Sequence, residues 1–445
     1  MDKATAIRNC LISRIESCPE GARLPSARKL AQESGVSFQF VQLVVDDLAD
    51  RGLICIQPRS GMTSHPQWKN RILNGVFRLS NNTLACDELR DFCRAAMPEL
   101  HISEHFNASN LELRVTHDLL SHHNSYRDLS QMLKKIVPDT AQLSEKILDA
   151  GRFGDTLCGV PVCFSPKVVA LNKRLFSRCN CPLPPENWTW QDCLDTISRL
   201  EKSLEPFRTF GTHSALSEWI NFVTVNGGSL YDPADSADPV KLDSPETLGA
   251  LEFFHSLYNR LKTPENLTKY NHTEDFNAGN IAMYQIVRQG LSSVYNAGVL
   301  KKEDIELRVL PVPRAGMVPR SMLGAAFFCV RCGTPDLKQA ERLLTRLLSP
   351  ECQKIFARVH SGIPVLQSAA REIFDSSDSH DAVFAAALPH AVLRYDIPDP
   401  ASYALICGGV RKAFELPRSK FTREIRRIAD ALRLLKEFNT NDTVF

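Results

Sequence analysis

The sequence predicts an α/β protein with a small, mostly helical N-terminal domain followed by two larger lobes. Residues 1–64 contain three helical patterns and two short apolar stretches, whereas from residue 71 onward short apolar stretches alternate with helical patterns. Such alternation is typical of α/β folds with mostly parallel sheets. The residues after 71 exceed one typical hydrophobic core, which favours two lobes within the chain of 445 residues.

The N-terminal helices are expected from apolar spacing and from capping residues. Residues 4–18 place isoleucine and leucine side chains on one face of a helix. Ser26 is expected to cap a second helix that ends at Gly35, and Ser37 a third that runs to about Arg51. The stretches "LICIQP" and "GMTS" then predict two short strands. We place domain boundaries at 1–65, a linker at 66–70 and the lobes at 71–445.

The remaining elements follow from the same two periodicities. Helices are expected at "CDELRDFCRAAM", "TWQDCLDTISRLEKSL", "PETLGALEFFHSLYNRL" and over much of the last hundred residues. Strands are expected at "NGVFRL", "LHISEHF", "LELRV", "GVPVCFSPKVVALN", "IELRVLPVP" and "AAFFCVRC".

Composition indicates an ordinary soluble globular protein, with 43% apolar residues, 23% charged residues and a net charge of +2. No apolar run is long enough for a membrane span, and the N-terminus lacks the pattern of a secretory signal, so we expect a cytoplasmic protein. Its fourteen cysteines are then expected to be reduced and incidental. No catalytic residue, metal site or cofactor is predicted, because the motifs for pyridoxal phosphate, phosphate loops and hydrolase elbows are missing.

The first 65 residues show a helix–turn–helix followed by a two-stranded wing, a layout that places its second helix in the major groove of DNA. The run "GARLPSARKLAQESGVSFQFVQLVVDDLADRGLICIQPRSGM" resembles the GntR-type winged-helix domain. That resemblance implies contacts with double-stranded DNA from Ser26, Arg28, Ser37, Phe38, Gln39, Gln42, Arg59 and Gly61.

Phe38 and Phe40 depart from the arginine and threonine that are usual in the family. A phenylalanine cannot make the bidentate pair with guanine that an arginine makes, although it can touch a thymine methyl group. Alternatively, Phe40 packs into the core, and Gln39 and Gln42 recognise adenine. The charge of residues 1–65 is only +1, from eight Lys and Arg against seven Asp and Glu, so we expect a homodimer on a two-fold operator.

Residues 71–445 resemble the maltose-binding type of solute-binding protein from carbohydrate ABC transporters. The segments that carry the resemblance occur in family order: "YRDL", "DTLCGVPVCF", "ALNKRLF", "PPENWTWQDCLD", "NGGSLYD", "LDSPETLGALEFF", "FNAGNIAMY", "VLPVPRAG", "LLSPECQ" and "SGIPV". The resemblance implies two lobes joined by crossing strands, with a ligand in the cleft between them. It also implies cleft residues at Asp118, Phe164, Trp219, Asn221, Tyr284 and Gly324.

The cleft prediction has one position with two interpretations and one departure from the family pattern. Trp219 is equally compatible with the cleft and with the core, and Leu171 replaces a tyrosine that is usual in the family. A sugar ligand is therefore an expectation from the resemblance. Together, the two resemblances predict a transcription regulator whose cytoplasmic domain binds a carbohydrate and changes operator affinity on cleft closure. The alternatives are a solute-binding protein whose head only dimerises, and a regulator with a non-carbohydrate ligand.

Overall fold

The computed structural model describes most of the chain. The described residues are 7, 10–12, 14–15, 17–50, 53–57, 61–66, 68, 74–77, 101–102, 111–143, 145–264, 270–334, 337–359, 362–373, 377–392 and 396–441. The helix predicted at "CDELRDFCRAAM" lies outside them. Within the part of the chain that is described, no helix is both long and apolar enough to cross a membrane.

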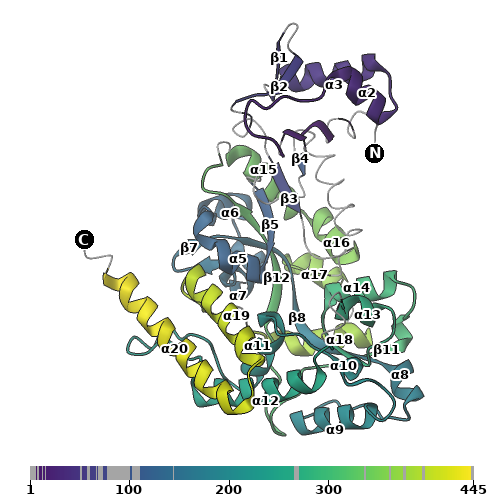
Figure 1. The fold of residues 1–445 in the computed structure, drawn as a ribbon, viewed down its shortest axis with the longest axis vertical. Helices are drawn as coiled ribbons and strands as arrows, with labels where there is room; N and C mark the ends of the chain where they lie inside the picture. Colours follow the sequence, from purple (N-terminus) through teal and green to yellow (C-terminus); the bar gives the residue numbers. More distant parts are fainter. Residues whose placement is uncertain are drawn as a thin grey trace.

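The N-terminal elements form at the positions that capping predicts, namely α2 (Ala27–Ser34), α3 (Phe38–Asp50), β1 (Ile54–Gln57) and β2 (Gly61–Ser64). The Ser26 hydroxyl accepts a hydrogen bond from the Lys29 amide at 3.3 Å. Helix α2 then ends at Gly35, whose φ of 65° suits a glycine. β1 and β2 pair antiparallel, with Ile54 opposite Ser64. Figure 1 shows this N-terminal head at one end of the long axis.

The head has its own hydrophobic core. Its buried side chains include Ile7, Leu11 and Ile15 from the first predicted helix, and Val41 and Leu48 from α3. Trp68, which lies in the predicted linker 66–70, is also fully buried in this cluster. The linker therefore contributes a core residue to the head, while the domain boundaries themselves stay a prediction.

The first lobe contains one group of strands and helices within residues 74–157 and a second group within residues 323–373. The first group is β3 (Asn74–Phe77), β4 (His101–Ile102), β5 (Leu111–Val115), α5 (Thr116–His122), η3 (His123–Ser125), α6 (Ser130–Ile136), η4 (Thr140–Gln142), α7 (Glu145–Asp149), β6 (Arg152–Phe153) and β7 (Thr156–Leu157). The second is β12 (Leu323–Val330), α15 (Leu337–Leu347), α16 (Pro350–Val359), β13 (Ile363–Pro364) and α17 (Gln367–Ile373). Both groups pack around one buried cluster.

The second lobe is built mainly from the middle and the end of the chain. Its first group is α8 (Lys173–Arg178), α9 (Trp190–Leu200), α10 (Pro206–Thr209), β9 (Phe210–Gly211), α11 (Leu216–Val225), α12 (Pro245–Leu261), α13 (His272–Asn277), β10 (Met283–Val287) and α14 (Arg288–Asn296). Its second group is η5 (Lys302–Asp304), β11 (Ile305–Arg308), α18 (Ser379–Ala387), η6 (Leu388–His390), α19 (Pro400–Phe414) and α20 (Arg418–Asn441). They enclose two further buried clusters.

One long strand, β8 (Val160–Asn172), joins the two lobes. Residues 160–166 pair with β12 of the first lobe, whereas residues 167–172 pair with β10 and β11 of the second. Two other segments cross beside it, because the Leu323 amide donates to Val392 O and the Val392 amide to Ser321 O, both at 2.8 Å. The crossing strands between two lobes agree with the prediction.

The prediction of mostly parallel sheets is wrong. The described strands form a sheet in the order β4-β3-β5-β12-β8-β10-β9, with β11 and β13 also paired to β8. Parallel pairs occur only at β3–β4, β3–β5 and β9–β10 among these strands, whereas each pair that includes β8 or β12 is antiparallel. Helix–strand alternation could not reveal this, because β8 and β12 come from distant parts of the chain and run antiparallel side by side.

Candidate functional site in the second lobe

A cavity of about 280 Å³ lies on the second lobe beside the crossing strands. Its walls come from Lys167 on β8, the start of α11, the end of β10, and helices α13 and α14. Val287 on this wall pairs with Lys167. A Cβ atom at Gly362 of the first lobe would lie 3.6 Å from Gln289 Nε2, another lining residue. The cavity therefore borders the junction between the lobes.

A buried ion pair forms one side of this cavity. Lys167 Nζ lies 2.5 Å from Glu218 Oε1, and their side chains are only 13% and 3% exposed. Lys167 Nζ also donates to the Ser217 carbonyl oxygen at 2.8 Å. Two opposite charges at this depth cost desolvation energy unless other polar partners complete the arrangement. The pair is thus a strong candidate for contact with a polar ligand.

Two histidines lie next to the ion pair. His213 Nε2 is 3.6 Å from Glu218 Oε1, and the His213 and His272 ring centroids are 6.4 Å apart. Burial lowers the pKa of His213. Burial and the neighbouring His213 lower the pKa of His272 to about 4. Both rings are therefore neutral near pH 7, when each can offer one donor and one acceptor nitrogen.

The lowered pKa of His272 predicts how the stability of the protein depends on pH. Unfolded His272 takes up its proton near the ordinary pKa of 6.5, whereas in the folded chain it stays neutral until about pH 4. The unfolded state thus binds more protons in this window, and the free energy of unfolding should fall as the pH drops from about 6.5 towards 4. Urea denaturation across this pH range should show that the free energy of unfolding falls less steeply in His272→Gln than in the unmodified chain. His117→Gln is the control, because the His117 side chain is 56% exposed, and an equal slope for both variants would contradict the assignment.

Tyr284, a predicted cleft residue, lines the cavity. Its ring stacks on Phe276 with centroids 5.5 Å apart, and its hydroxyl shares a 2.7 Å hydrogen bond with Thr273 Oγ1. Burial raises the pKa of Tyr284, so the phenol stays protonated and keeps a hydrogen available for donation.

Several polar atoms of the lining residues have no hydrogen-bond partner among the described residues. They are Glu218 Oε2, Asn277 Oδ1, Gln285 Nε2 and Gln289 Oε1. Leaving such a buried group unpaired costs roughly 1–3 kcal/mol. A polar ligand that satisfies them would recover part of that cost, and this favours a hydroxyl-rich or amide-rich ligand over an apolar one.

Asn221 and Gly324 lie immediately behind the cavity. Asn221 Nδ2 donates to Gln285 Oε1 at 3.1 Å, and Asn221 Oδ1 accepts from the Met322 amide at 3.0 Å. The amide therefore ties the cavity wall to a crossing segment. A Cβ at Gly324 would lie 3.5 Å from Val287 Cγ1, an ordinary van der Waals distance, so Gly324 lies beside the cavity wall. Neither residue is among those that line the cavity.

Two predicted cleft residues belong to the core instead. Trp219 is fully buried, and its ring lies 6.2 Å from Phe414 in an edge arrangement. Consecutive residues of a helix are rotated by about 100°, so Glu218 lines the cavity while Trp219 packs into the second lobe. Phe164 packs in the core of the first lobe, opposite Ala325 and Ile363.

Asp118 lies on the first lobe, in the first turn of α5. Its carboxylate is 3.4 Å from His117 Nε2 and 4.0 Å from Arg114 Nη1, and it is 34% exposed. Thr116, two residues earlier, accepts a hydrogen bond from the Ala325 amide at 3.1 Å, next to Gly324. Asp118 is thus near the lobe junction, although it does not line the described cavity.

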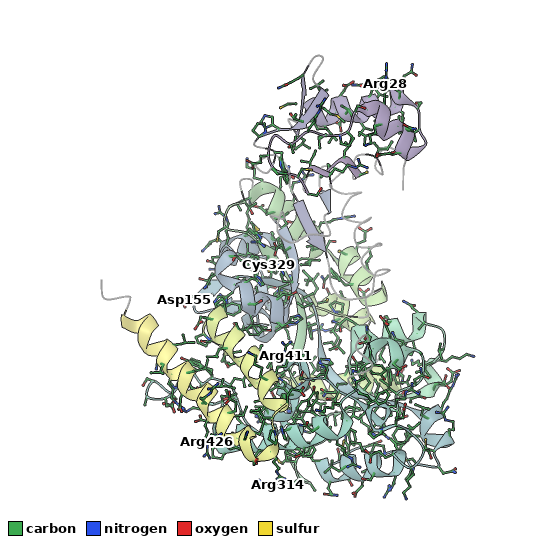
Figure 2. All side chains as sticks on the ribbon, viewed as in Figure 1. Arg28, Asp155, Arg314, Cys329, Arg411 and Arg426 are labelled. Carbon is green, nitrogen blue, oxygen red and sulfur yellow. The ribbon has the colours of Figure 1, made fainter. Side chains whose placement is uncertain are left out.

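The described residues that are predicted to contact DNA lie on α2, α3 and β2 of the head or at the N-terminal caps of the two helices. Arg28 is exposed, as Figure 2 shows, and its guanidinium carbon lies 5.9 Å from the Phe38 ring centroid. Ser37 Oγ accepts from the Phe40 amide at 3.3 Å, and Phe40 packs against the head core.

The other residues predicted to contact DNA differ in exposure and in hydrogen bonding within the head. Ser26 and Gln39 are exposed, and Gly61 is exposed with a φ of 93°. Gln42 Nε2 donates to Asp46 at 2.8 Å. Arg59 lies outside the described residues.

Comparison with known proteins concerns the two-lobed part. Residues 109–385 match the family model of bacterial extracellular solute-binding proteins. An ABC substrate-binding protein from Listeria monocytogenes in complex with cycloalternan has a TM-score of 0.68 at 17% identity, covering 82% of this chain and 98% of its own. A search of the curated proteins found no match.

Two further solved structures extend the comparison. A solute-binding protein from Thermotoga lettingae bound with α-D-tagatose has a TM-score of 0.68 at 16% identity, covering 81% of this chain and 97% of its own. UgpB from Mycobacterium tuberculosis in complex with glycerophosphocholine has a TM-score of 0.66 at 14% identity, covering 83% of this chain and 99% of its own. At these identities the likeness shows a shared fold, and it confirms the predicted two-lobed solute-binding architecture. Since the family model covers more than half of the sequence, the chain belongs to the bacterial extracellular solute-binding protein family.

Proposed function

We propose that the two lobes bind a small polar solute of the carbohydrate class, with the cavity around Lys167 and Glu218 as the recognition site of the second lobe. The buried ion pair carries this proposal, because it presents charged hydrogen-bonding groups at 2.5 Å separation beside the lobe junction. Carboxylate, ammonium and amide groups pair well with sugar hydroxyls. Two of the structural relatives were solved with a cycloalternan and with tagatose.

The size of the cavity favours a small ligand. A volume of about 280 Å³ is near the lower limit of small-molecule sites. The Tyr284 ring stacks on Phe276, and Tyr284 is only 9% exposed, so little of its ring is left for stacking on a sugar. A monosaccharide or a single terminal sugar residue fits these features better than a long stacked oligosaccharide. One structurally similar protein was solved with glycerophosphocholine, so a non-carbohydrate polar solute is the alternative ligand class.

A thermal-shift screen tests the proposal. Monosaccharides, disaccharides, cyclic oligosaccharides and glycerophosphocholine should be compared on the full chain, because a ligand that binds only the folded state raises the melting temperature by mass action. We expect a monosaccharide to give the largest shift. If glycerophosphocholine alone shifts the melting temperature, the carbohydrate assignment fails while solute binding stands.

A second function, DNA-dependent transcription regulation, is supported by the head. The observations that support this hypothesis are the helices α2 and α3, the hairpin β1–β2 that follows them, and the exposed pair Arg28 and Phe38. In this hypothesis a cytoplasmic homodimer binds a two-fold operator, and solute binding changes the spacing of its heads. The family match and the solved structures concern the lobes, so solute binding is the better supported function, and a head that only dimerises is the alternative.

Footprinting on the DNA upstream of the protein's own coding sequence tests the regulator hypothesis. A protected two-fold site, altered by the solute that the thermal screen identifies, is the expected result. If no site is protected with or without that solute while the chain is dimeric in solution, the head serves dimerisation.

Phe38 offers a specific test of DNA recognition by α3. Its side chain is 45% exposed under the Arg28 guanidinium, so Phe38→Ala should weaken operator binding by roughly tenfold, equivalent to about 1.4 kcal/mol. Phe38→Arg should shift preference towards a guanine-containing site. Leu43→Ala is the control, because Leu43 is an exposed apolar residue of the same helix, 68% accessible. Unchanged binding by Phe38→Ala would leave Gln39 and Gln42 as the recognising residues.

A further inference from the structure

A second, larger cavity of about 540 Å³ lies between the two lobes, and it shares no lining residue with the solute cavity. One wall comes from the first lobe, from η3 and the hairpin β6–β7. The other comes from Tyr231 and residues 396–398 of the second lobe. In Figure 1 the elements α5 and β7 lie on the opposite side of β8 and β12 from α13 and α14. The two cavities therefore flank the crossing strands.

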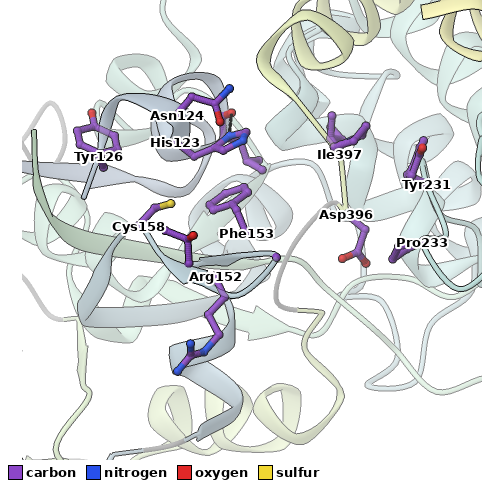
Figure 3. Close-up of a pocket in the computed structure, with 14 residues that line it drawn as sticks. His123, Asn124, Tyr126, Arg152, Phe153, Cys158, Tyr231, Pro233, Asp396 and Ile397 are labelled. Carbon is purple, nitrogen blue, oxygen red and sulfur yellow. Dashed lines mark hydrogen bonds between the residues drawn. The ribbon is translucent and has the colours of Figure 1, made fainter. Parts of the chain in front are cut away.

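Aromatic side chains line both walls of this interlobe cavity. His123 and Phe153 stack in parallel, with ring centroids 4.1 Å apart and planes 2° from coplanar. His123 Nδ1 is held by the Leu120 carbonyl oxygen at 3.0 Å, which fixes the imidazole plane. Figure 3 shows Phe153 beside His123, with Tyr231, Asp396 and Ile397 across from them. Flat rings thus face the cavity from both lobes.

Asp396, on the wall formed by the second lobe, has an unusual backbone conformation. Asp396 has a φ of 46°, and Asn180 is the only other non-glycine residue with a positive φ in the described part of the chain. Such conformations cost free energy and tend to occur at ligand sites and hinges. Asp396 follows Val392, which pairs with the crossing segment at Met322. The strained residue therefore places its carboxyl group in the cavity, close to the segment that connects the lobes.

We propose that this interlobe cavity binds a second small molecule, a compound with a flat ring and hydrogen-bonding groups on its edge. The ring would stack against Phe153 and Tyr231, since offset-stacked aromatic pairs are favourable beyond the area they bury. Edge groups would meet the Asp396 carboxylate and the Asn124 amide, which also line the cavity. The volume lies well within the range of small-molecule sites, roughly 300–1,000 Å³.

The position of this site determines its effect on solute binding. Two lobes that rotate about the strands between them narrow one flanking space while they widen the other. Closure of the lobes around the solute cavity therefore widens the interlobe cavity. A ring compound that contacts Phe153 and Tyr231 at the same time loses one of these contacts on widening, so it resists that closure. The two ligands are then negatively coupled, and each must weaken the other by the same factor. This coupling rests on the proposed solute site, whereas ring binding itself does not.

Saturation-transfer NMR on the full chain tests ring binding. The probe is benzamide, and cyclohexanecarboxamide is the matched compound without a flat ring. We expect benzamide to bind at least tenfold more tightly than cyclohexanecarboxamide. Phe153→Leu on one lobe and Tyr231→Leu on the other should each reduce benzamide binding at least fivefold, and Glu218→Gln in the solute cavity should leave it unchanged. Equal binding of the two amides, or benzamide binding that survives both leucine variants, overturns the proposal.

The coupling is measured separately, with the sugar that gives the largest thermal shift. Calorimetric titration of that sugar with and without saturating benzamide should show weaker sugar binding, and the reverse titration should show the same factor. Equal sugar affinities with and without benzamide overturn the negative coupling. If no sugar binds but benzamide behaves as expected, the proposed carbohydrate function fails and the interlobe site remains.

Discussion

Glu218→Ala should weaken solute binding at least about 100-fold, which corresponds to roughly 2.7 kcal/mol. The substitution removes a carboxylate that is 3% exposed and leaves the Lys167 ammonium, itself 13% exposed, without its 2.5 Å partner. Removing one member of a buried ion pair is strongly destabilising, because the remaining charge stays desolvated. The Glu218 Oε2 atom, which has no partner among the described residues, would also be lost to the ligand.

Calorimetric titration with the sugar from the thermal screen measures this effect. Glu201→Gln is a suitable control, since Glu201 pairs with Arg260 Nε at 2.8 Å on the same lobe and does not line the cavity. Its solute affinity should equal that of the unmodified chain. A Glu218→Ala protein that is folded and binds the sugar with unchanged affinity would remove Glu218 from the recognition site.

A double variant separates binding from folding. Replacing both charges, in Lys167→Met with Glu218→Met, removes the uncompensated ammonium, and such apolar replacement of a buried pair is often neutral or stabilising. We expect this protein to recover the melting temperature that Glu218→Ala loses, while its sugar affinity stays at least about 100-fold below that of the unmodified chain. Recovery of sugar binding together with the melting temperature would show that the pair acts only through stability.

Local signals allowed the head to be predicted closely from the sequence. Ser26, Gly35 and Ser37 act through hydrogen bonds and backbone angles within a few residues, and the helices between them begin and end as expected. The strands β1 and β2 follow from equally short patterns. Whether this head binds DNA depends on its surface and partners, which such patterns do not determine.

The solute cavity could be predicted only in part, because its residues converge from distant segments. Tyr284 was identified from the strand motif that precedes it, but Lys167, His213 and Glu218 meet only after β8 and α11 pack together. Helix α11 is buried on nearly all sides, from Leu216 to Val225 with only Ser217 exposed. One face of the helix nevertheless carries polar residues at helical spacing, namely Ser217, Glu218, Asn221 and Thr224. Trp219 lies on the opposite face, so this spacing is the signal that places Glu218, and not Trp219, at the cavity.

Glu112→Ala should lower the free energy of unfolding of the first lobe by about 3–5 kcal/mol, the range for breaking a buried charge network. Glu112 is fully buried on β5. It accepts hydrogen bonds from Arg114 Nε at 2.7 Å, Tyr126 Oη at 2.6 Å and Arg331 Nε at 2.6 Å. Burial raises the pKa of Tyr126, so the phenol remains a donor. Removal of Glu112 takes from each of these donors its carboxylate acceptor.

Urea denaturation monitored by hydrogen exchange at the β5 and β12 amides measures this loss in the first lobe. Glu341→Ala is the matched control, because Glu341 accepts from Lys135 Nζ at 2.8 Å on the surface, where the lysine is 69% exposed. Surface pairs of this kind contribute about 0–1 kcal/mol. Glu112→Gln keeps the shape and one acceptor oxygen, so its loss should fall between the two. A Glu112→Ala protein no less stable than Glu341→Ala would mean that the arginines re-solvate freely, and that the network between β5, β12 and Tyr126 does not hold the first lobe together.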